Sequence, residues 1–414
     1  MLLFAAPFVA PEVAHGTIIY VDDDNVAGPW DGTLEHPYQH VQSAIDYAGS
    51  GDTVYVCEGT YYENIVVHQS VSLIGQDAQN TIMDGGGNGI VVTLTAGGIT
   101  IKGFTVRNGG SDYPAGGIFV DSTYNVISGN VVTGPQLHGI VLESSSHNTV
   151  SDNTVTGNEV FGIYLHSSSN HNTVSRNTVA GTGLHGIDLN HADWNVIAGN
   201  TVEDHEQGIQ LWSSSSNTLR GNTISNNLDG IKMKIVSDNN LVYGNTISGN
   251  QRGIFVCFYG RGSTAAAQNN TIYHNNFTGN GENSYDTNIN NWDDGYPSGG
   301  NYWDDYTGID NFSGPNQDDP GSDGIGDTAY YVHGEGNNLD RFPLMSPWNL
   351  RGDANGDGVI DVGDVVCVVN YLYRGGDPPV PVEAGDANCD GVVDVGDVVY
   401  LVNYLYRGGP PPGC

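Results

Sequence analysis

A Gly-Ile dipeptide recurs along the middle of the chain and marks a regular alternation of apolar and polar positions. It begins at residues 117, 139, 162, 186, 208, 230 and 253, at intervals of 22 to 24 residues. Each interval contains three short alternating runs, as GIVLE, NTVSD and NTVTG show between residues 139 and 157. Alternation with a period of two is typical of β-strands. The pattern therefore predicts three short strands in every repeat.

Two columns of asparagine run in phase with the Gly-Ile repeat. Asparagine tolerates the left-handed backbone conformation of tight turns, and stacked asparagine amides form hydrogen-bonded ladders. We therefore expect these residues at the turns, in the left-handed conformation. The columns are Asn125, Asn148, Asn172, Asn195, Asn217 and Asn240, and then Asn130, Asn153, Asn177, Asn200, Asn222 and Asn245.

A repeat of this length cannot bury its own apolar residues and must stack on its neighbours. Ile, Val and Leu then point inward, one coil above another, and the chain forms an all-β parallel β-helix. The coils are expected over residues 65–283. About nine coils would form a rod of roughly 45 Å at ~4.8 Å per coil.

Both ends of such a rod need a cover, because an unpaired strand edge promotes aggregation. In residues 17–64 the spacing of Val41, Ala44, Ile45 and Ala48 predicts a short amphipathic helix within an N-terminal cap. Residues 284–348 are expected to form the C-terminal cap. Residues 1–16 include the apolar run Leu2 to Ala10 without a preceding basic residue, which fits either the remnant of a secretion signal or a frayed start. No apolar run approaches the ~18 residues of a membrane span.

Composition narrows the possible partners. The 414 residues include 12 Lys and Arg against 47 Asp and Glu, for a formal net charge of -35. A chain this acidic repels phosphate backbones, so nucleic acid is excluded as a partner class. Five cysteines are too few and too scattered for a disulfide framework, and their pairing stays open.

The C-terminal segment carries a duplicated motif. Residues 352–376 and 385–409 are identical at 21 of 25 positions, and each contains a D-x-N-x-D-G-x-x-D-x-x-D loop that leads into a helical pattern. Alternate positions of such a loop wrap oxygen ligands around one Ca²⁺ ion. The predicted ligands are Asp353, Asn355, Asp357, the Val359 carbonyl, Asp361 and Asp364 in the first loop, and Asp386, Asn388, Asp390, the Val392 carbonyl, Asp394 and Asp397 in the second.

Aspartate at the twelfth loop position and a single exiting helix per half make residues 351–414 similar to dockerin domains. The resemblance implies a small α-helical domain with two calcium ions and a cohesin module as partner. Val362-Gly363 and Val395-Gly396 stand where many dockerins carry Ser-Thr, which leaves the identity of the cohesin open. Because the halves are near copies, a cohesin could dock on either one, with Tyr371 and Arg374 or Tyr404 and Arg407 as contacts.

The rest of the chain resembles another family. VQSAIDYAGSGDTVYVCEGTYYENIVV, leading into the Asn and Gly-Ile coils, is similar to the pectin-lyase-like right-handed β-helix proteins. GNYWDDY, DGIGDT and DRFPLM are similar to the ending of many NosD-like surface proteins. The resemblance covers residues 17–345 and implies a right-handed helix with carbohydrate-binding and sugar-hydrolase repeats. The acidic loop from Asp318 to Asp327 is a further candidate for calcium, or simply a polar part of the cap.

The strand that starts at each Gly-Ile exposes a strip of unusual side chains. Most other outward positions are Ser, Thr or Asn, whereas this strip gathers aromatic, histidine, acidic and basic residues. Aromatic rings stack on sugars, and cations hold uronate carboxylates. The alternative is an ordinary solvated face that differs between repeats by drift. The candidates for substrate binding are Tyr164, His166, Asn190 and Trp212, and those for catalysis are His185, Asp188, Asp229, Lys232, Lys234 and Arg252.

These residues suit two kinds of chemistry. His185 and Asp188 are candidates for proton transfer. In a polysaccharide lyase a cation neutralises the uronate carboxylate while a base, commonly Lys or Arg, removes the C5 proton, so a lyase would need Lys232, Lys234 or Arg252. Asp188 and Asp229, two coils apart at roughly 10 Å, would instead form the carboxylate pair of a glycoside hydrolase.

We therefore predict an extracellular, secreted or cell-surface protein of bacterial or archaeal type that binds and degrades an acidic polysaccharide. Whether it is an enzyme stays open. One alternative is a non-catalytic glycan-binding or adhesion module, and a weaker one is the metal handling of NosD proteins. Thirteen scattered histidines without metal-ligand spacing favour the polysaccharide.

Overall fold

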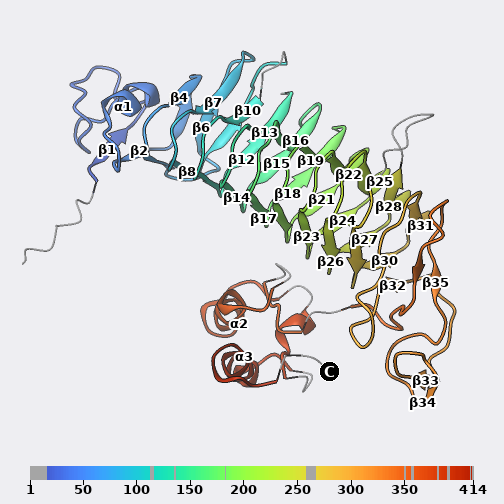
Figure 1. The fold of residues 1–414 in the computed structure, drawn as a ribbon. Coiled ribbons are helices and arrows are strands. Elements are labelled where there is room, and N and C mark those ends of the chain that lie inside the picture. The colour runs from blue at the N-terminus through green and yellow to red at the C-terminus, as the bar shows by residue number, and fades with distance from the viewer. Residues whose placement is uncertain are drawn as a thin grey trace, which may run out of the picture.

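Three parallel sheets wind around one axis in the computed structural model (Figure 1). The structure describes residues 16–111, 116–134, 137–181, 183–257, 267–348, 351–355, 359–379, 382–388, 392–410 and 412. Sheets A and B each contain 11 strands and sheet C contains 10. Successive strands of one sheet come from successive coils, which is the topology of a parallel β-helix. The predicted fold class is confirmed, and sheet C shows ten coils where about nine were expected.

The strands are short, and all neighbours within sheets A, B and C pair in parallel register. Sheet A consists of β1 (Ile18–Val21), β2 (Thr53–Val56), β5 (Ser72–Gly75), β8 (Thr100–Lys102), β11 (Val126–Ser128), β14 (Thr149–Ser151), β17 (Thr173–Ser175), β20 (Val196–Ala198), β23 (Thr218–Arg220), β26 (Leu241–Tyr243) and β29 (Thr271–Tyr273). Sheet B consists of β3 (Gly59–Tyr61), β6 (Thr81–Asp84), β9 (Thr105–Arg107), β12 (Val131–Thr133), β15 (Thr154–Thr156), β18 (Thr178–Ala180), β21 (Thr201–Glu203), β24 (Thr223–Ser225), β27 (Thr246–Ser248), β30 (Asn276–Thr278) and β32 (Tyr302–Trp303). Sheet C consists of β4 (Ile65–Val67), β7 (Ile90–Leu94), β10 (Gly116–Val120), β13 (His138–Glu143), β16 (Phe161–His166), β19 (His185–Asn190), β22 (Gln207–Trp212), β25 (Asp229–Lys234), β28 (Arg252–Cys257) and β31 (Glu282–Asp286).

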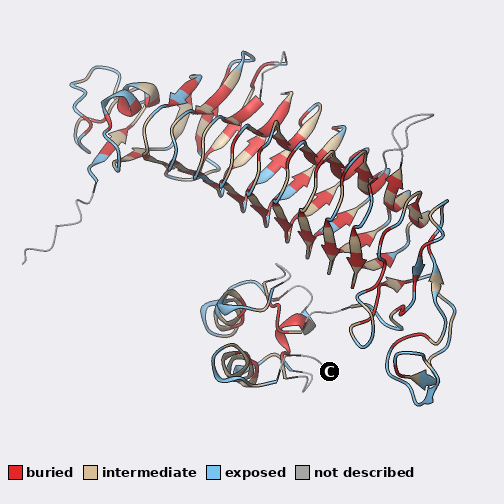
Figure 2. Cartoon of the chain, in the orientation of Figure 1, coloured by how far each residue is buried: buried red, intermediate tan, exposed pale blue. Residues whose placement is uncertain are grey.

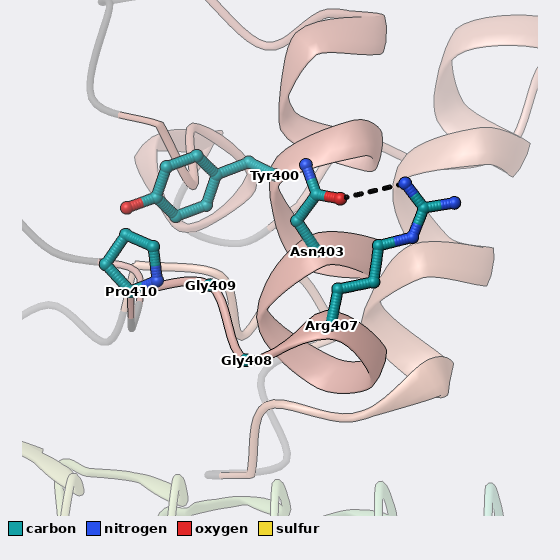
Figure 3. A pocket seen from close by; sticks show the side chains of 6 residues that line it. All are labelled: Tyr400, Asn403, Arg407, Gly408, Gly409 and Pro410. Atoms are coloured by element: carbon teal, nitrogen blue, oxygen red, sulfur yellow. Dashed lines mark hydrogen bonds between the residues drawn. The ribbon is translucent and has the colours of Figure 1, made fainter.

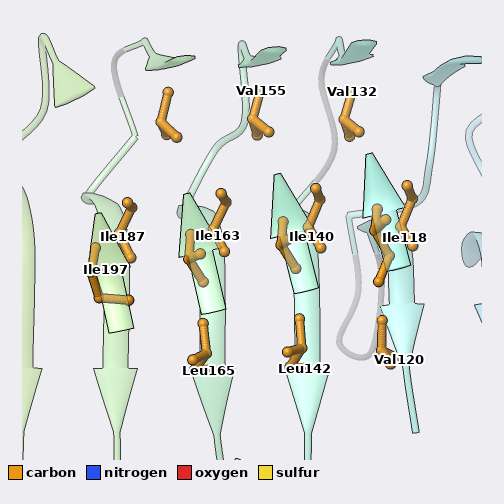
Figure 4. Close-up of a cluster of buried hydrophobic side chains, with 14 of the residues drawn as sticks. Ile118, Val120, Val132, Ile140, Leu142, Val155, Ile163, Leu165, Ile187 and Ile197 are labelled. Carbon is orange, nitrogen blue, oxygen red and sulfur yellow. The ribbon is translucent and has the colours of Figure 1, made fainter. Parts of the chain in front are cut away.

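The interior is filled by columns of aliphatic side chains. Ile118, Ile140, Ile163 and Ile187 follow one another up the axis and are fully buried (Figure 4). Buried segments run along all three sheets of the rod (Figure 2). The glycines before Ile140, Ile163 and Ile187 are required by space, since a Cβ at Gly139 would lie 2.4 Å from the carbonyl oxygen of Gly162. The Gly-Ile signal therefore reports a close approach between adjacent coils.

Asparagine ladders join the coils at the turns. In each ladder the side-chain oxygen of one asparagine accepts hydrogen bonds from the backbone N–H and the side-chain amide of the asparagine one coil earlier, as Asn200 does from Asn177 at 2.9 and 3.0 Å. Both predicted columns form such ladders and continue to Asn290 and Asn301. A third ladder, through Asn227, Asn250 and Asn280, was not predicted.

The predicted backbone conformation of these asparagines is wrong. The left-handed residues are the ones before the ladder positions, such as His171 with φ 57° before Asn172 and Trp194 with φ 60° before Asn195. The preceding residue turns the corner, so that the asparagine side chain can point inward and meet the next coil.

The two ends of the rod are covered. Helix α1 (Val41–Tyr47) packs Val41, Ala44 and Ile45 onto the first coils. At the other end the indole N–H of Trp303 donates to buried Asp340 at 2.8 Å, and that of Trp292 donates to buried Asp286 at 2.9 Å. Two small hairpins complete this cap, one of β33 (Phe312–Ser313) with β34 (Asp319–Pro320) and one of β35 (Tyr330–Tyr331) with β36 (Leu339–Asp340).

The C-terminal segment forms a separate small core. Helices α2 (Val362–Arg374) and α3 (Val395–Arg407) pack together around Ala354, Val368, Ala387 and Leu401, and a short 3₁₀ helix, η1 (Val382–Gly385), precedes the second loop. Asp361 and Asp394 cap the two helices, and Gly375 and Gly408 end them in the left-handed conformation. Among the described residues, no helix is long and apolar enough to cross a bilayer.

The ladders predict a specific stability effect. Asn200→Ala removes the side-chain oxygen that accepts from the backbone N–H of Asn177, so this buried N–H loses its acceptor, and the Asn177 amide, the Val174 carbonyl and the Asn222 oxygen each lose one hydrogen bond. We expect the free energy of unfolding to fall by at least about 2 kcal/mol, measured by urea denaturation. The control Thr178→Ala, at an exposed strand position, should change it by less than about 0.5 kcal/mol. Equal effects of both variants would show that the ladder does not hold the coils together.

Candidate functional site

Three rows of outward side chains cross sheet C from β13 to β28, and we call them together the site face. The first row precedes each glycine, the second follows each isoleucine, and the third ends each strand. Successive residues of one row are backbone pairing partners on neighbouring strands. The rows are His138, Phe161, His185, Gln207, Asp229 and Arg252; then Val141, Tyr164, Asp188, Gln210, Lys232 and Phe255; then Glu143, His166, Asn190, Trp212, Lys234 and Cys257.

The second row forms the floor of the site face. Tyr164 is 7% exposed, Asp188 1% and Gln210 2%. Every residue of the third row and three residues of the first row are partly exposed. A ligand therefore meets the third row, the exposed members of the first row, and Lys232 and Phe255, the two partly exposed members of the second row. Tyr164 stacks against Phe161 and His166, so its ring is not open to a sugar as the sequence suggested.

His185, Asp188 and Gln210 form a hydrogen-bonded group on β19 and β22. The Nδ1 atom of His185 contacts the Oδ2 atom of Asp188, and the Gln210 amide donates to the same oxygen at 2.7 Å. This arrangement orients the imidazole and leaves its Nε2 atom for proton exchange. The Asp188 Oδ1 and Gln210 Oε1 atoms are buried and have no hydrogen-bond partner among the described residues. The predicted pair is thus joined, with Gln210 as a third member that the sequence did not single out.

Asp229 is held between two cations. Lys232 Nζ lies 2.7 Å from Asp229 Oδ2, and Arg252 Nε donates to Oδ1 at 2.5 Å. Asp229 itself is 0% exposed. A carboxylate neutralised in this way is a poor proton donor or nucleophile, which argues against a hydrolytic pair of Asp188 and Asp229. Two cations against one anion leave a local positive charge on a strongly acidic protein.

Lys234 adds a third cation beside this group. Burial, with the neighbouring charge of Lys232, lowers the pKa of the Lys234 ammonium. Its Nζ atom lies 5.3 Å from the centre of the Trp212 ring, while the Arg252 guanidinium lies 3.7 Å from that of Phe255. The aromatic rings thus hold the cations in place at the surface.

Within the first row, His138 and Phe161 form a stacked group of rings with His185. His138 stacks on Phe161 at 5.0 Å, and Phe161 stacks on His185 at the same distance. Burial lowers the pKa of His138 to about 4, so its imidazole is neutral near pH 7. The Gly-Ile register places these three residues in one row, but the sequence does not show that His138 is buried there.

The described part of the duplicated loops includes ten of the twelve predicted ligand residues. Asp364 is fully buried and accepts the backbone N–H groups of Asn355 and Asp361 at 3.1 and 2.7 Å. Asp397 accepts those of Asn388 and Asp394 at the same distances in the second loop. Asp353 and Asp386 are buried beside them. Buried carboxylates need a compensating cation, and this all-oxygen set fits a hard ion such as Ca²⁺. Val359 and Val392 are described and exposed, whereas Asp357 and Asp390 lie outside the described residues.

The acidic loop of the C-terminal cap is arranged differently. Asp323 accepts the N–H of Ile325, and Asp327 those of Asn311 and Phe312. In the described part of the chain, no three His, Cys, Asp or Glu residues converge into a metal-binding group. The carboxylates of Asp323 and Asp327 thus accept hydrogen bonds from backbone N–H groups.

Two hollows lie outside the site face. One, of about 550 Å³, is lined by Glu282, Asn283, Asp304, Asp305 and His333 where sheet C meets the cap. The other, of about 320 Å³, lies at the end of α3 between Tyr400, Asn403, Arg407 and Pro410 (Figure 3). Cys57, Cys257 and Cys367 are free thiols, and the other two cysteines are not described.

Comparison with protein families gives two matches. A model described as periplasmic copper-binding protein (NosD) matches residues 45–215 and 169–308, which together span more than half of the chain. A model of the dockerin type I domain matches residues 351–409. No curated protein is similar enough in sequence to count as a relative.

Several solved structures share the β-helix. The Dettilon tailspike protein is 16% identical, with a TM-score of 0.47, over 69% of this chain and 66% of its own, slightly under two thirds. The A-module of a mannuronan C-5 epimerase from Azotobacter vinelandii is 18% identical, with a TM-score of 0.43, over 68% of this chain and 93% of its own. An alginate lyase from Paenibacillus is 17% identical, with a TM-score of 0.41, over 63% and 94%. These similarities concern the fold alone.

The buried histidine of the site face predicts a pH dependence. The pKa of His138 is about 4 in the folded protein and about 6.5 when unfolded. The unfolded chain therefore binds more protons between these values, and His138 makes stability fall as pH drops from 6.5 to 4. His138→Phe keeps a ring against Phe161 and removes the titration. The difference in unfolding free energy between wild type and variant should shift by up to about 3 kcal/mol between pH 7.5 and 4.5.

The control is His171→Phe, at an exposed turn position. A second control, Thr178→Ala at an exposed strand position, involves no titratable group, so its difference from wild type should stay constant with pH. A constant difference for His138→Phe as well would show that this imidazole is not buried.

Proposed function

From the premise that this chain belongs to the NosD family through its β-helix and ends in a type I dockerin domain, we propose that its site face cleaves a uronate-containing polysaccharide by β-elimination. One observation carries the proposal. The oriented imidazole of His185 and the excess positive charge around Lys232 and Arg252 lie on the same face, with Lys232 two coils and Arg252 three coils beyond His185. At ~4.8 Å per coil, one sugar residue fits between them.

Each residue of the site face has one task in the proposed reaction. Lys232 and Arg252 neutralise the uronate carboxylate, which acidifies the adjacent C5 proton. His185 Nε2 takes that proton, the electron pair forms the C4–C5 double bond, and the C4–O4 bond breaks. Lys234 donates a proton to the leaving O4 atom, a task that its lowered pKa favours. Asp188 keeps the imidazole oriented and stabilises it once it is protonated.

Trp212 and the third row supply the binding surface. Trp212, His166 and Asn190 are partly exposed and lie in register on successive coils. An extended polymer that runs along the axis meets each of them in turn. The partly exposed Trp212 indole beside Lys234 suits a sugar ring with an adjacent negative charge.

Copper handling receives less support. The family description names copper, but the described residues contain no group of three or more His, Cys, Asp or Glu side chains that could hold a metal ion. The cations and the histidine of the site face instead suit an anionic sugar.

We further propose that the dockerin domain attaches the β-helix to an extracellular scaffold through a cohesin module. Dockerin type I domains bind calcium, and the two loops present the oxygen ligands. The near-identical helices α2 and α3 offer Tyr371 and Arg374 or Tyr404 and Arg407 to the partner.

Turnover tests the proposed chemistry. The purified chain with calcium is incubated with acidic and neutral polysaccharides, and both unsaturated-uronate absorbance and reducing ends are followed. We expect absorbance to rise on a polyuronate, and His185→Ala to slow it at least about 100-fold because general base catalysis is lost. The control Trp194→Ala, 59% exposed at a turn outside the site face, should keep full activity.

Other results would contradict the lyase. Reducing ends without absorbance would indicate hydrolysis. Binding without turnover would indicate a non-catalytic glycan-binding module. No interaction with any polymer would indicate that the β-helix serves as a spacer.

Cohesin capture tests the attachment. A panel of immobilised cohesins should retain the chain in calcium and release it in chelator. Asp361→Asn and Asp394→Asn should each keep part of the binding if either half can dock. Complete loss in one of them, with both helices still folded by circular dichroism, would contradict docking by either half.

A further inference from the structure

The rows of the site face continue for one more coil, onto β31. Glu282 follows Arg252 in the first row. Tyr285 follows Phe255 in the second row, and the two ring centres lie 5.5 Å apart. Here the rows meet the hollow of about 550 Å³ at the cap, which we call the end hollow and whose lining includes Glu282, Asn283, Asp304, Asp305 and His333. A polymer that runs along the rows therefore enters the end hollow directly after the cations.

Neutral groups fix two carboxylates in the end hollow. Asn283, which is 6% exposed, donates its amide to Asp304 Oδ1 at 3.0 Å and to Asp305 Oδ1 at 2.9 Å. The Tyr330 hydroxyl donates to Asp305 Oδ2 at 3.2 Å. Both aspartates are exposed. These hydrogen bonds hold the two carboxylates side by side and leave their negative charge in place.

The sign of the charge reverses between β28 and the end hollow. Glu282 supplies a third carboxylate, whose Oε1 atom lies 3.3 Å from His333 Nδ1. None of the described residues that line the end hollow is Lys or Arg. On the two preceding coils, by contrast, Arg252 and Lys232 share the single carboxylate of Asp229. Neighbouring positions along one polymer path thus carry opposite charge.

Charge rather than space decides which sugar the end hollow accepts. Its volume falls within the range of small-molecule sites, so one sugar residue fits. A uronate carboxylate there would face three carboxylates, and like charges placed together act against binding. Sugar hydroxyl or ammonium groups would instead donate hydrogen bonds to the same carboxylate oxygens. The end hollow is therefore suited to a sugar that carries hydrogen-bond donors and no negative charge.

We propose that the end hollow selects a sugar residue without a carboxylate beside the bound uronate, so that the preferred substrate is a copolymer of uronate with a neutral or amine-bearing sugar. Glu282, Asp304 and Asp305 are the specificity-determining residues. The inference rests on the proposed function, because it takes the uronate to lie at Lys232 and Arg252. A polymer of uronate alone is still bound and cleaved, but it is repelled where it passes over β31.

Oligosaccharide binding tests this selection. The full chain with His185→Ala, which leaves the ligand uncleaved, is titrated by calorimetry with calcium at low ionic strength. The ligands form two pairs of equal length, each sharing one uronate: oligogalacturonate with the alternating galacturonate–rhamnose oligosaccharide, and oligoglucuronate with the alternating glucuronate–N-acetylglucosamine oligosaccharide. In the pair that the site face accepts, the alternating ligand should bind at least about tenfold more tightly, and added salt should reduce this ratio because it screens the repulsion. Tighter binding after N-deacetylation would assign the amine-bearing sugar, and equal binding the neutral one.

Paired substitutions separate the end hollow from the total charge of the chain. Glu282→Gln with Asp305→Asn keeps a side-chain oxygen for the Asn283 amide. This variant should bind the ligand of uronate alone about tenfold more tightly and change the alternating ligand by less than about twofold. The control, Asp24→Asn with Glu35→Gln, removes the same charge from exposed positions between β1 and α1 and should change both ligands by less than about twofold.

The outcomes distinguish this inference from the proposed elimination. Equal affinity for both members of a pair that binds, or no gain for the ligand of uronate alone in the folded double variant, would overturn the inference. If the double variant unfolds, the ligand pairs and their salt dependence still decide the question in the parent chain. Selective binding without unsaturated-uronate absorbance from the wild-type chain would overturn the elimination and keep the inference. Failure of both pairs to bind would overturn both.

Discussion

Registered stacking of one coil on the next is the constraint on which this molecule depends. Backbone hydrogen bonds set the distance between coils, and the buried asparagine ladders set the lateral register. A slip of one residue would turn the aliphatic columns outward and leave the ladder amides without partners. Because the register is kept over so many coils, any residue type placed at one repeat position forms a straight row on the surface.

The site face follows directly from that constraint. Residues that are 22 to 24 positions apart in sequence become neighbours, as His185, Gln207 and Asp229 do in the first row. The same stacking adds Gln210 of the next coil to the His185–Asp188 pair within β19, and Arg252 of the next coil to the Asp229–Lys232 pair within β25. An anionic polymer approaching this acidic protein finds at the site face a concentration of positive charge that most of the surface lacks.

Much of this arrangement could be predicted because it is periodic. The spacing of Gly117, Gly139 and later glycines revealed the coils, and the positions one and three residues beyond each isoleucine, with the residue before each glycine, identified the rows. The offset of the left-handed residues could not be read from composition, since His171 and Trp194 are unusual at such positions. The sequence also did not show which outward residues are buried, because the exposure of Tyr164 depends on the sizes of its neighbours in adjacent coils. The pairing of Arg351 with Asp386 lies beyond any repeat pattern, because it joins two halves of a small domain through their tertiary packing.

The central claim is that the site face holds a uronate chain along its rows. The most direct test is the crystal structure of the His185→Ala variant with a uronate oligosaccharide. The account predicts sugar density along β19, β22, β25 and β28, with one carboxylate beside Lys232 and Arg252 and the adjacent C5 atom facing position 185. Density on sheet A or B, or an unoccupied site face at saturating oligosaccharide, would contradict it.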